Sequence, residues 1–216
     1  MSLRNNIDRH GFFRAVVARM LQALEQHVGL HIWSINVRPL AESFDIPPEH
    51  SDKLRIARLD LEETLRAAEQ DDLQLSANFV RAAFARGDIC VGAFDHERLV
   101  AYTWRSTSVA PITLDLWIRI DVRPQAYGYK SFVHPGYRGR RLNDSVGRYC
   151  DPLLFQMGIK HRIAYIDLHN LSSIRGTFRD PKTQRIGYAG YRKRDSNYWT
   201  FRTKGVRDYL SFEVRT

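Results

Sequence analysis

The chain has 216 residues, of which 44% are hydrophobic and 26% are charged. This length and apolar content are enough for a buried core and exclude a disordered chain. No apolar run reaches the roughly 18 residues of a membrane-spanning helix. The N-terminus lacks the apolar core of a secretory signal and only two cysteines occur, so we expect a cytoplasmic protein without a disulfide framework. A formal charge of +9 predicts an anionic partner.

The first 88 residues alternate between helical and extended patterns. Apolar residues recur at steps of three and four before Gly29, which predicts an amphipathic helix that ends there. The expected elements are a helix at 13–28, a strand at 30–38, a loop at 41–52, and helices at 53–69 and 73–86. We expect residues 1–29 to form an N-terminal helix packed on the core, and residues 30–216 to form one domain.

After residue 88 the apolar period changes from 3.6 to 2, which is typical of strands. The expected elements are strands at 89–94, 99–104, 116–122 and 127–133, a helix at 142–159, a strand at 162–168, a short helix at 171–179, and a hairpin of 186–193 and 198–203. Turns at 95–97 and 123–125 predict antiparallel hairpins. This order predicts an α+β fold, with a mixed and mostly antiparallel twisted sheet flanked by helices.

The segment 131–147, SFVHPGYRGRRLNDSVG, carries the most specific signal. A strand ends at Val133, Pro135 and Gly136 make a turn, and an amphipathic helix follows. The first N–H groups of a helix have no partners within the helix, and its dipole is positive there. Such an end binds phosphate groups, and the arginines of the loop add positive charge. The alternative is a solvated basic turn before an ordinary core helix.

This segment resembles the signature V-x-P-x-x-R-G-x-G-x-G/A of the GNAT acyltransferase superfamily. The matching residues are Val133, Pro135, Arg138 and Gly139. Downstream, Asn170 and the pair Gly187-Tyr188 follow in the order that the family often shows, and the resemblance covers roughly residues 30–205. It implies a GNAT-like sheet with a splayed pair of central strands, 127–133 and 162–168.

The chain departs from the family at three positions. Arg141 and Asn143 stand where the family usually has small residues, and Asn tolerates left-handed backbone angles better than most residues do. The family's usual general-acid tyrosine falls on Thr177. The proton donor is therefore absent from its expected position.

The resemblance implies direct transfer of an acyl group, in the first instance acetyl, from an acyl-CoA to a primary amine. Backbone N–H groups from Ser131 through Phe132 to Val133 would bind the thioester carbonyl. The residues implied in holding the donor are Arg138, Gly139, Arg140, Arg141, Leu142, Asn143 and Asn170. The acceptor would be a small molecule or a peptide.

Several residues remain open as the base that deprotonates the amine and the acid that protonates the thiolate. The family's carboxylate position aligns with Tyr127, a poor base, while histidines have better reference pKa values. The candidate bases are Tyr127, His134, His169, Asp121 and Asp167, and the candidate acids are Ser173, Thr177 and Tyr188. Spacing alone does not choose between them.

Other functions were weighed against these patterns. His27 and His31 have a metal-ligand spacing, but Gly29 interrupts the helix between them, so we expect no metal. A long-chain N-acyltransferase that uses acyl-ACP or acyl-CoA is one alternative, and a basic nucleic-acid-binding module without catalysis is another, although nucleic acid is the less favoured partner. An acyl carrier protein, a second copy of the chain in a homodimer, and an anionic membrane at the N-terminal helix stay open as partners.

Overall fold

The computed structural model describes residues 11–43, 54–120, 124–195 and 197–215. Its main sheet has eight strands in the order β10-β9-β1-β8-β7-β4-β3-β2. These strands are β1 (Leu30–Pro39), β2 (Arg55–Leu59), β3 (Ile89–Asp95), β4 (Arg98–Ser106), β7 (Gln125–Val133), β8 (His161–Asp167), β9 (Gln184–Arg194) and β10 (Asn197–Arg202). Every neighbouring pair is antiparallel except β7 and β8, which are parallel. The predicted fold class is confirmed.

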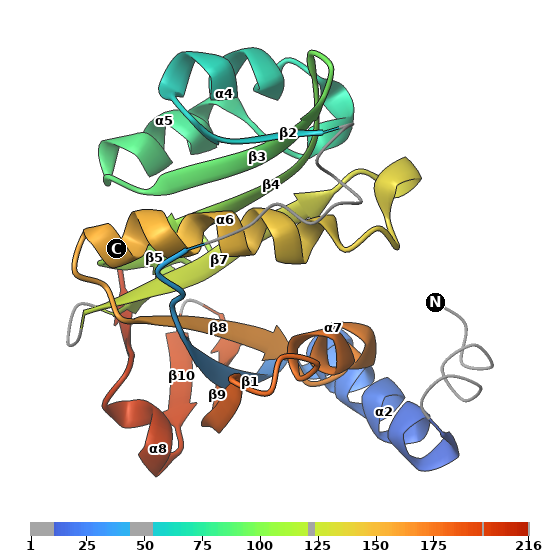
Figure 1. Cartoon of the computed structure of the whole chain (residues 1–216). Coiled ribbons are helices and arrows are strands. Elements are labelled where there is room, and N and C mark those ends of the chain that lie inside the picture. The colour runs from blue at the N-terminus through green and yellow to red at the C-terminus, as the bar shows by residue number, and fades with distance from the viewer. Residues whose placement is uncertain (1–10, 44–53, 121–123, 196, 216) are drawn as a thin grey trace.

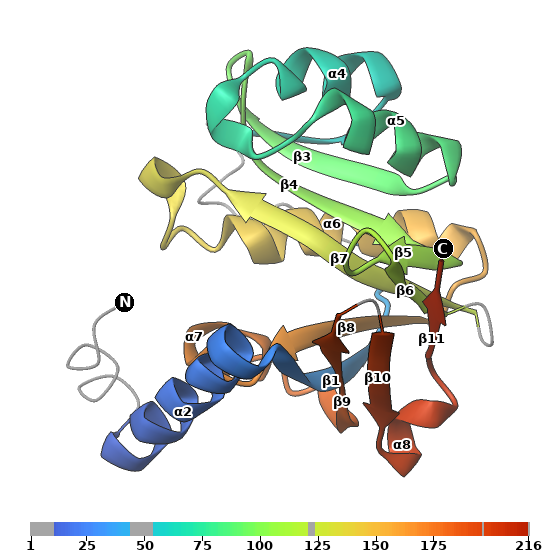
Figure 2. The same ribbon diagram turned by 180° about the vertical axis from the view of Figure 1, so that it is seen from behind.

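Helices cover both faces of the half-sheet β2-β3-β4-β7 (Figures 1 and 2). The helical elements are α2 (Phe12–Val28), α4 (Leu61–Ala68), η1 (Asp71–Leu73), α5 (Ala77–Ala85), η2 (Pro135–Tyr137), α6 (Leu142–Gln156), α7 (Leu171–Thr177) and α8 (Lys204–Arg207). Leu142, Val146 and Leu154 of α6 pack on β2, β3 and β4 in one cluster. Val80 and Ala83 of α5 pack with Trp104 of β4 in another. Strands buried on both sides explain the nearly continuous apolar pattern of β3 and β4.

A smaller sheet covers the other half of the molecule. It has the order β11-β6-β5, with β5 (Val109–Pro111), β6 (Leu116–Arg119) and β11 (Ser211–Val214). Leu116 and Ile118 of β6 pack in one cluster with Trp33 of β1, Tyr127 of β7 and Ile163 of β8. The face of β7 and β8 that carries Tyr127 and Ile163 is therefore closed by apolar side chains.

Two predicted elements are wrong. The helix at 53–69 is the strand β2 followed by α4, and Asp60 separates them because its side chain and that of Glu63 form a capping box. The expected hairpin of 116–122 with 127–133 does not form, since β6 pairs with β5 and β11. The candidate base Asp121 lies outside the described residues. Sequence patterns also missed β5, α8 and β11, which are only three or four residues long.

The predicted N-terminal helix is present as α2 and lies against β1. It ends at Gly29, which has the left-handed φ of 66° that glycine adopts without strain. Much of its apolar surface is exposed, including Phe13 and Met20. Among the described residues, none of the helices combines the length and apolar character that crossing a membrane requires. A domain boundary at residue 29 stays a prediction.

Candidate functional site

The parallel strands β7 and β8 separate partway along their length. They pair from Gln125 with His161 to Gly128 with Ala164. Beyond Gly128, β7 pairs with β4 alone, and beyond Ala164, β8 pairs with β1 alone. Their ribbons diverge toward α7 (Figure 1). This divergence is the splay that the sequence predicted, and it leaves backbone groups of both strands without a partner in the ladder.

An irregularity in β7 marks the point of separation. Trp104 of β4 pairs with Lys130, and the next residue, Arg105, pairs with Gly128, so Tyr129 is an extra residue of β7. A β-bulge of this kind bends its strand and increases the local twist. The bend turns the remainder of β7 away from β8.

The buried side chain of Arg105 fills the apex of the splay. It is 6% exposed, and its Nη1 donates to Thr103 Oγ1 at 2.6 Å and to the Trp104 carbonyl at 3.0 Å. A Cβ at Gly128 would lie 2.6 Å from this Nη1, so only glycine leaves room for it. Thr103 Oγ1 in turn contacts the hydroxyl of Ser131 at 2.7 Å. Ser131, a predicted catalytic residue, is thus held by β4 on the free part of β7.

The basic loop after β7 leads to the free end of α6. Gly139 has φ 84° and Arg141 has φ 59°, and both residues are exposed. No side chain caps α6, and the structure records no hydrogen bond from the N–H groups of residues 139–143 to another described residue. Leu142 is buried beneath this end while Asn143 is exposed. The role of these amides in binding an anion stays a prediction.

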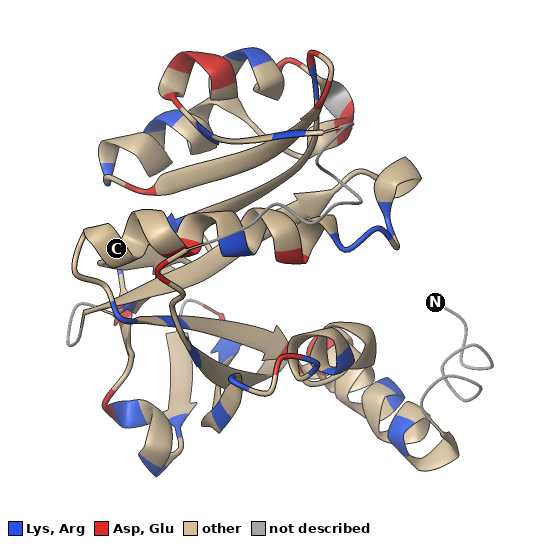
Figure 3. Ribbon diagram, in the orientation of Figure 1, with Lys and Arg blue, Asp and Glu red and all other residues tan. Residues whose placement is uncertain are grey.

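Charged side chains surround this helix end. Arg138 is exposed, and its Nε donates to the Val133 carbonyl at 3.3 Å, while Arg140 lies over the ring of Tyr137. Asp144, in the first turn, contacts the guanidinium of Arg148 at 3.0 Å. This contact offsets the one negative charge that would oppose an anion here. Figure 3 shows the Lys and Arg positions of the loop beside α6.

A buried ion-pair cluster fixes α6 to the far half of the sheet. Asp151 of α6 is fully buried and pairs with Arg38 of β1 and, at 3.6 Å, with Arg162 of β8. Burial raises the pKa of Asp151, and the neighbouring guanidinium groups oppose that shift. The helix whose N-terminus meets the basic loop is therefore held by both β1 and β8.

Two of the predicted catalytic residues on β7 and its end are engaged elsewhere. Tyr127 is 1% exposed within the aromatic core, and burial raises the pKa of its hydroxyl well above the usual value. His134 contacts Asp72 at 3.2 Å and Arg98 at 3.3 Å, and its Nδ1 accepts from the Gly136 N–H. Both side chains are therefore engaged with other groups of the protein.

The other residues predicted to contact the acyl donor lie on the two sides of the splay. Phe132 is buried and stacks on Tyr102, while Val133 packs toward α6. Asn170 is the N-cap of α7, and its side chain accepts from the N–H of Ser173 at 3.1 Å. This bond gives Asn170 a structural role whether or not it also contacts a ligand.

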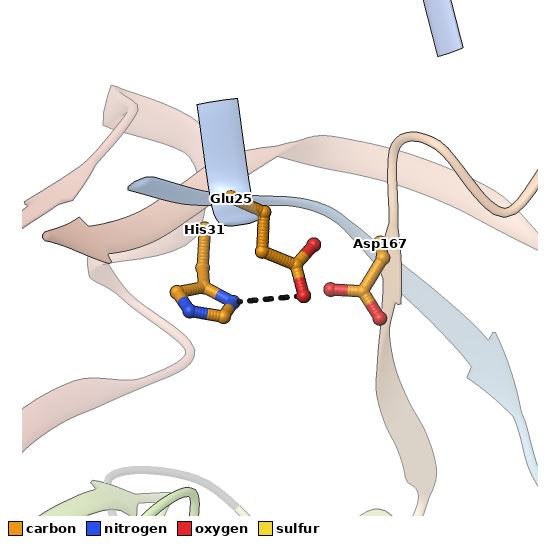
Figure 4. Close-up of side chains that lie close together, drawn as sticks. All are labelled: Glu25, His31 and Asp167. Carbon is orange, nitrogen blue, oxygen red and sulfur yellow. Dashed lines mark ion pairs between the residues drawn. The ribbon is translucent and has the colours of Figure 1, made fainter. Parts of the chain in front are cut away.

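A titratable cluster that the sequence did not predict lies at the end of the free part of β8 (Figure 4). Glu25 of α2 contacts His31 of β1 at 3.6 Å and His169 at 3.1 Å. Ligand atoms of Glu25, His31 and Asp167 all lie within 4.8 Å of one another. His169 and Asp167 are candidate bases from the sequence and His31 is considered there as a metal ligand with His27, but nothing in the sequence indicates that Glu25 joins them.

Comparisons with known proteins find likenesses among solved structures alone. No protein-family model matches the chain, and no curated protein matches it. The match to a solved Drosophila protein covers 85% of this chain and 56% of the Drosophila chain, with 14% identity and a TM-score of 0.50. A putative GNAT-family acetyltransferase from Novosphingobium aromaticivorans covers 74% of this chain, with 14% identity and a TM-score of 0.47. The ribosomal-protein-S18-alanine N-acetyltransferase from Escherichia coli covers 56% of this chain and 72% of its own, with 12% identity and a TM-score of 0.41.

These likenesses concern the fold alone. The chain spans 61% of the length of the Novosphingobium protein. The splayed parallel pair, the bulge in β7 and the basic loop before α6 together give the chain a GNAT-like fold.

Proposed function

We propose that the protein is an N-acyltransferase that moves an acyl group, in the first instance acetyl, from a CoA thioester to a primary amine. The observation that carries this proposal is the free end of α6 beside the splay. Amides of residues 139–143 and three exposed arginines there match the charge and hydrogen-bonding needs of a pyrophosphate. Apart from its chain neighbours, no atom of the described residues lies within 4 Å of where a Cβ would stand at Gly139. A ligand can therefore approach the backbone closely there.

The unpaired edge of β7 suits the thioester end of the donor. Backbone N–H groups beyond Gly128 that face the splay would donate to the carbonyl oxygen and stabilise the oxyanion that forms when the amine attacks. The new C–N bond forms as the C–S bond breaks, and the sulfur leaves as a thiolate that takes up a proton. The protein's contribution is to orient the carbonyl and to stabilise its developing charge.

The amine must lose a proton before or during its attack. Tyr127 and His134 are engaged as described, so we place this proton on water. Tyr165, on the free part of β8, packs with Trp33 and Tyr127 in the aromatic cluster, and burial raises its pKa to about 12. The proton for the leaving thiolate therefore also comes from water in this proposal.

Calorimetry with CoA tests the donor site. We expect Arg138→Ala to weaken CoA binding about 10- to 100-fold, which corresponds to the loss of a hydrogen bond to a charged group. Arg81→Ala, which removes an exposed arginine of α5, is the matched control and should leave binding unchanged. The placement fails if both variants bind CoA equally. The whole proposal fails if the unaltered protein shows no CoA binding at millimolar concentration.

Thiol release from acetyl-CoA in the presence of primary amines tests the reaction itself. Both cysteines of the protein are buried, so a thiol reagent should report CoA with little background. Replacing acetyl-CoA by long-chain acyl-CoA or acyl-ACP compares the donors. Salt-dependent binding of duplex DNA or RNA without CoA binding would instead favour the basic nucleic-acid module.

A further inference from the structure

We propose that Glu25, His31 and Asp167 bind one divalent transition-metal ion of the zinc class, with a water molecule as the fourth ligand. The three residues come from α2, β1 and β8. Imidazole and carboxylate are the ligand types that Zn²⁺ takes in proteins, and three of them with a water molecule complete a tetrahedral shell. The metal would join β8 to α2 and β1, which lie more than a hundred residues earlier in the chain.

The spacing of the ligand atoms fits such a shell. In tetrahedral zinc sites with bonds near 2.1 Å, neighbouring ligand atoms are about 3.4 Å apart. Here Glu25 Oε1 lies 3.6 Å from His31 Nδ1, and ligand atoms of Glu25, His31 and Asp167 all lie within 4.8 Å of one another. Figure 4 shows His31 and Asp167 on either side of the Glu25 carboxylate, whose Oε2 is held by His169 Nδ1 at 3.1 Å.

Neighbouring residues orient the ligands. Trp33 Nε1 donates to Asp167 Oδ1 at 2.7 Å, which fixes the carboxylate and leaves lone pairs of both oxygens for an ion. The ring of His31 stacks on Tyr191 at 4.4 Å between centroids with an interplanar angle of 11°. Metal sites commonly hold their ligands through outer contacts of this kind.

The charges of the cluster also favour a cation. Two carboxylates, Glu25 and Asp167, approach within 4.8 Å of each other while each is only partly exposed. Like charges at that distance repel, and a bound divalent cation would offset the repulsion.

Zinc binding to the purified full-length chain tests the proposal at pH 7.5, after treatment with a chelator and dialysis. We expect saturable binding of one Zn²⁺ per chain by calorimetry, and a higher Tm when Zn²⁺ is present. Bound Co²⁺ should give the visible spectrum of a four-coordinate site. None of these measurements depends on acyltransferase activity.

Glu25→Gln and His31→Ala should each weaken Zn²⁺ binding at least about 10-fold, as loss of ligand support does in known sites. His27→Ala is the matched control, because His27 is exposed on the same helix and lies outside the cluster. The Tm of each variant in chelator shows that it is folded. The proposal is overturned if the protein takes up no Zn²⁺ at about 100 μM, or if His27→Ala lowers the affinity as much as Glu25→Gln does.

Discussion

Replacing Asp151 by Asn tests how α6 is held over the sheet. The substitution keeps the volume of the side chain and removes its charge, leaving Arg38 and Arg162 without their buried partner. Arg38 is only 6% exposed and keeps one carboxylate contact, with Asp180 at 3.3 Å, while the side chain of Arg162 is 18% exposed. Removing one member of a buried ion pair costs about 3–5 kcal/mol of stability. The amide oxygen of Asn still accepts a hydrogen bond, so we expect a loss of about 3 kcal/mol. That is a large part of the stability of a typical domain.

Urea unfolding followed by tryptophan fluorescence measures this loss. With a slope of about 2 kcal/mol per molar urea, the expected change lowers the midpoint by about 1.5 M. Asp115→Asn is the control, because the side chain of Asp115 is half-exposed and its pair with Lys193 at 3.5 Å should contribute less than about 1 kcal/mol. If Asp151→Asn shifts the midpoint no more than the control, the buried cluster does not stabilise the fold and our account of α6 is wrong.

Three further predictions concern backbone and thiols. Arg141→Gly should raise the free energy of unfolding by about 1 kcal/mol, because it relieves the left-handed φ of 59°, yet weaken CoA binding in the same calorimetric assay. Gly190→Ala should lower the free energy of unfolding in urea by about 1–3 kcal/mol, since the new Cβ would lie 2.1 Å from a carbonyl oxygen of β1. Gly176→Ala is the control: a Cβ there has nothing within 4 Å, so the substitution should be neutral or stabilising. Cys90 and Cys150 are buried and burial raises the pKa of each thiol, so a thiol reagent should modify them readily only in denaturant; rapid modification of the native protein would contradict this.

Much of the fold could be predicted from apolar periodicity. The strands β3, β4, β8 and β9 and the helices α2 and α6 lie where the patterns placed them, because each has a continuous or periodic apolar face. The failure at 53–69 has a local reason. Ile56 and Leu59 are three residues apart, as on a helix, and the capping pair Asp60 and Glu63 that marks the true start of α4 was overlooked.

Strand pairing could not be derived from the pattern. The residues of β6 alternate as those of an ordinary hairpin partner would, but their partners in β11 follow almost a hundred residues later. Alternation reports which face of a strand is buried and says nothing about its neighbour. The splay itself was expected only through the family resemblance, since the bulge at Tyr129 has no signature in the sequence.

The candidate site was predictable where it is local and not where it is assembled from distant segments. The loop from Arg138 to Arg141 and the helix after it are contiguous, so their role as an anion site could be proposed from the sequence. The cluster around Glu25 could not, because it depends on the position of β1 between β8 and β9. That position also brings Arg38 to Asp151 and so connects the N-terminal strand to α6. β1 thus brings His31 to Asp167 and also holds α6, whose N-terminus follows the basic loop. The two candidate sites therefore share one support.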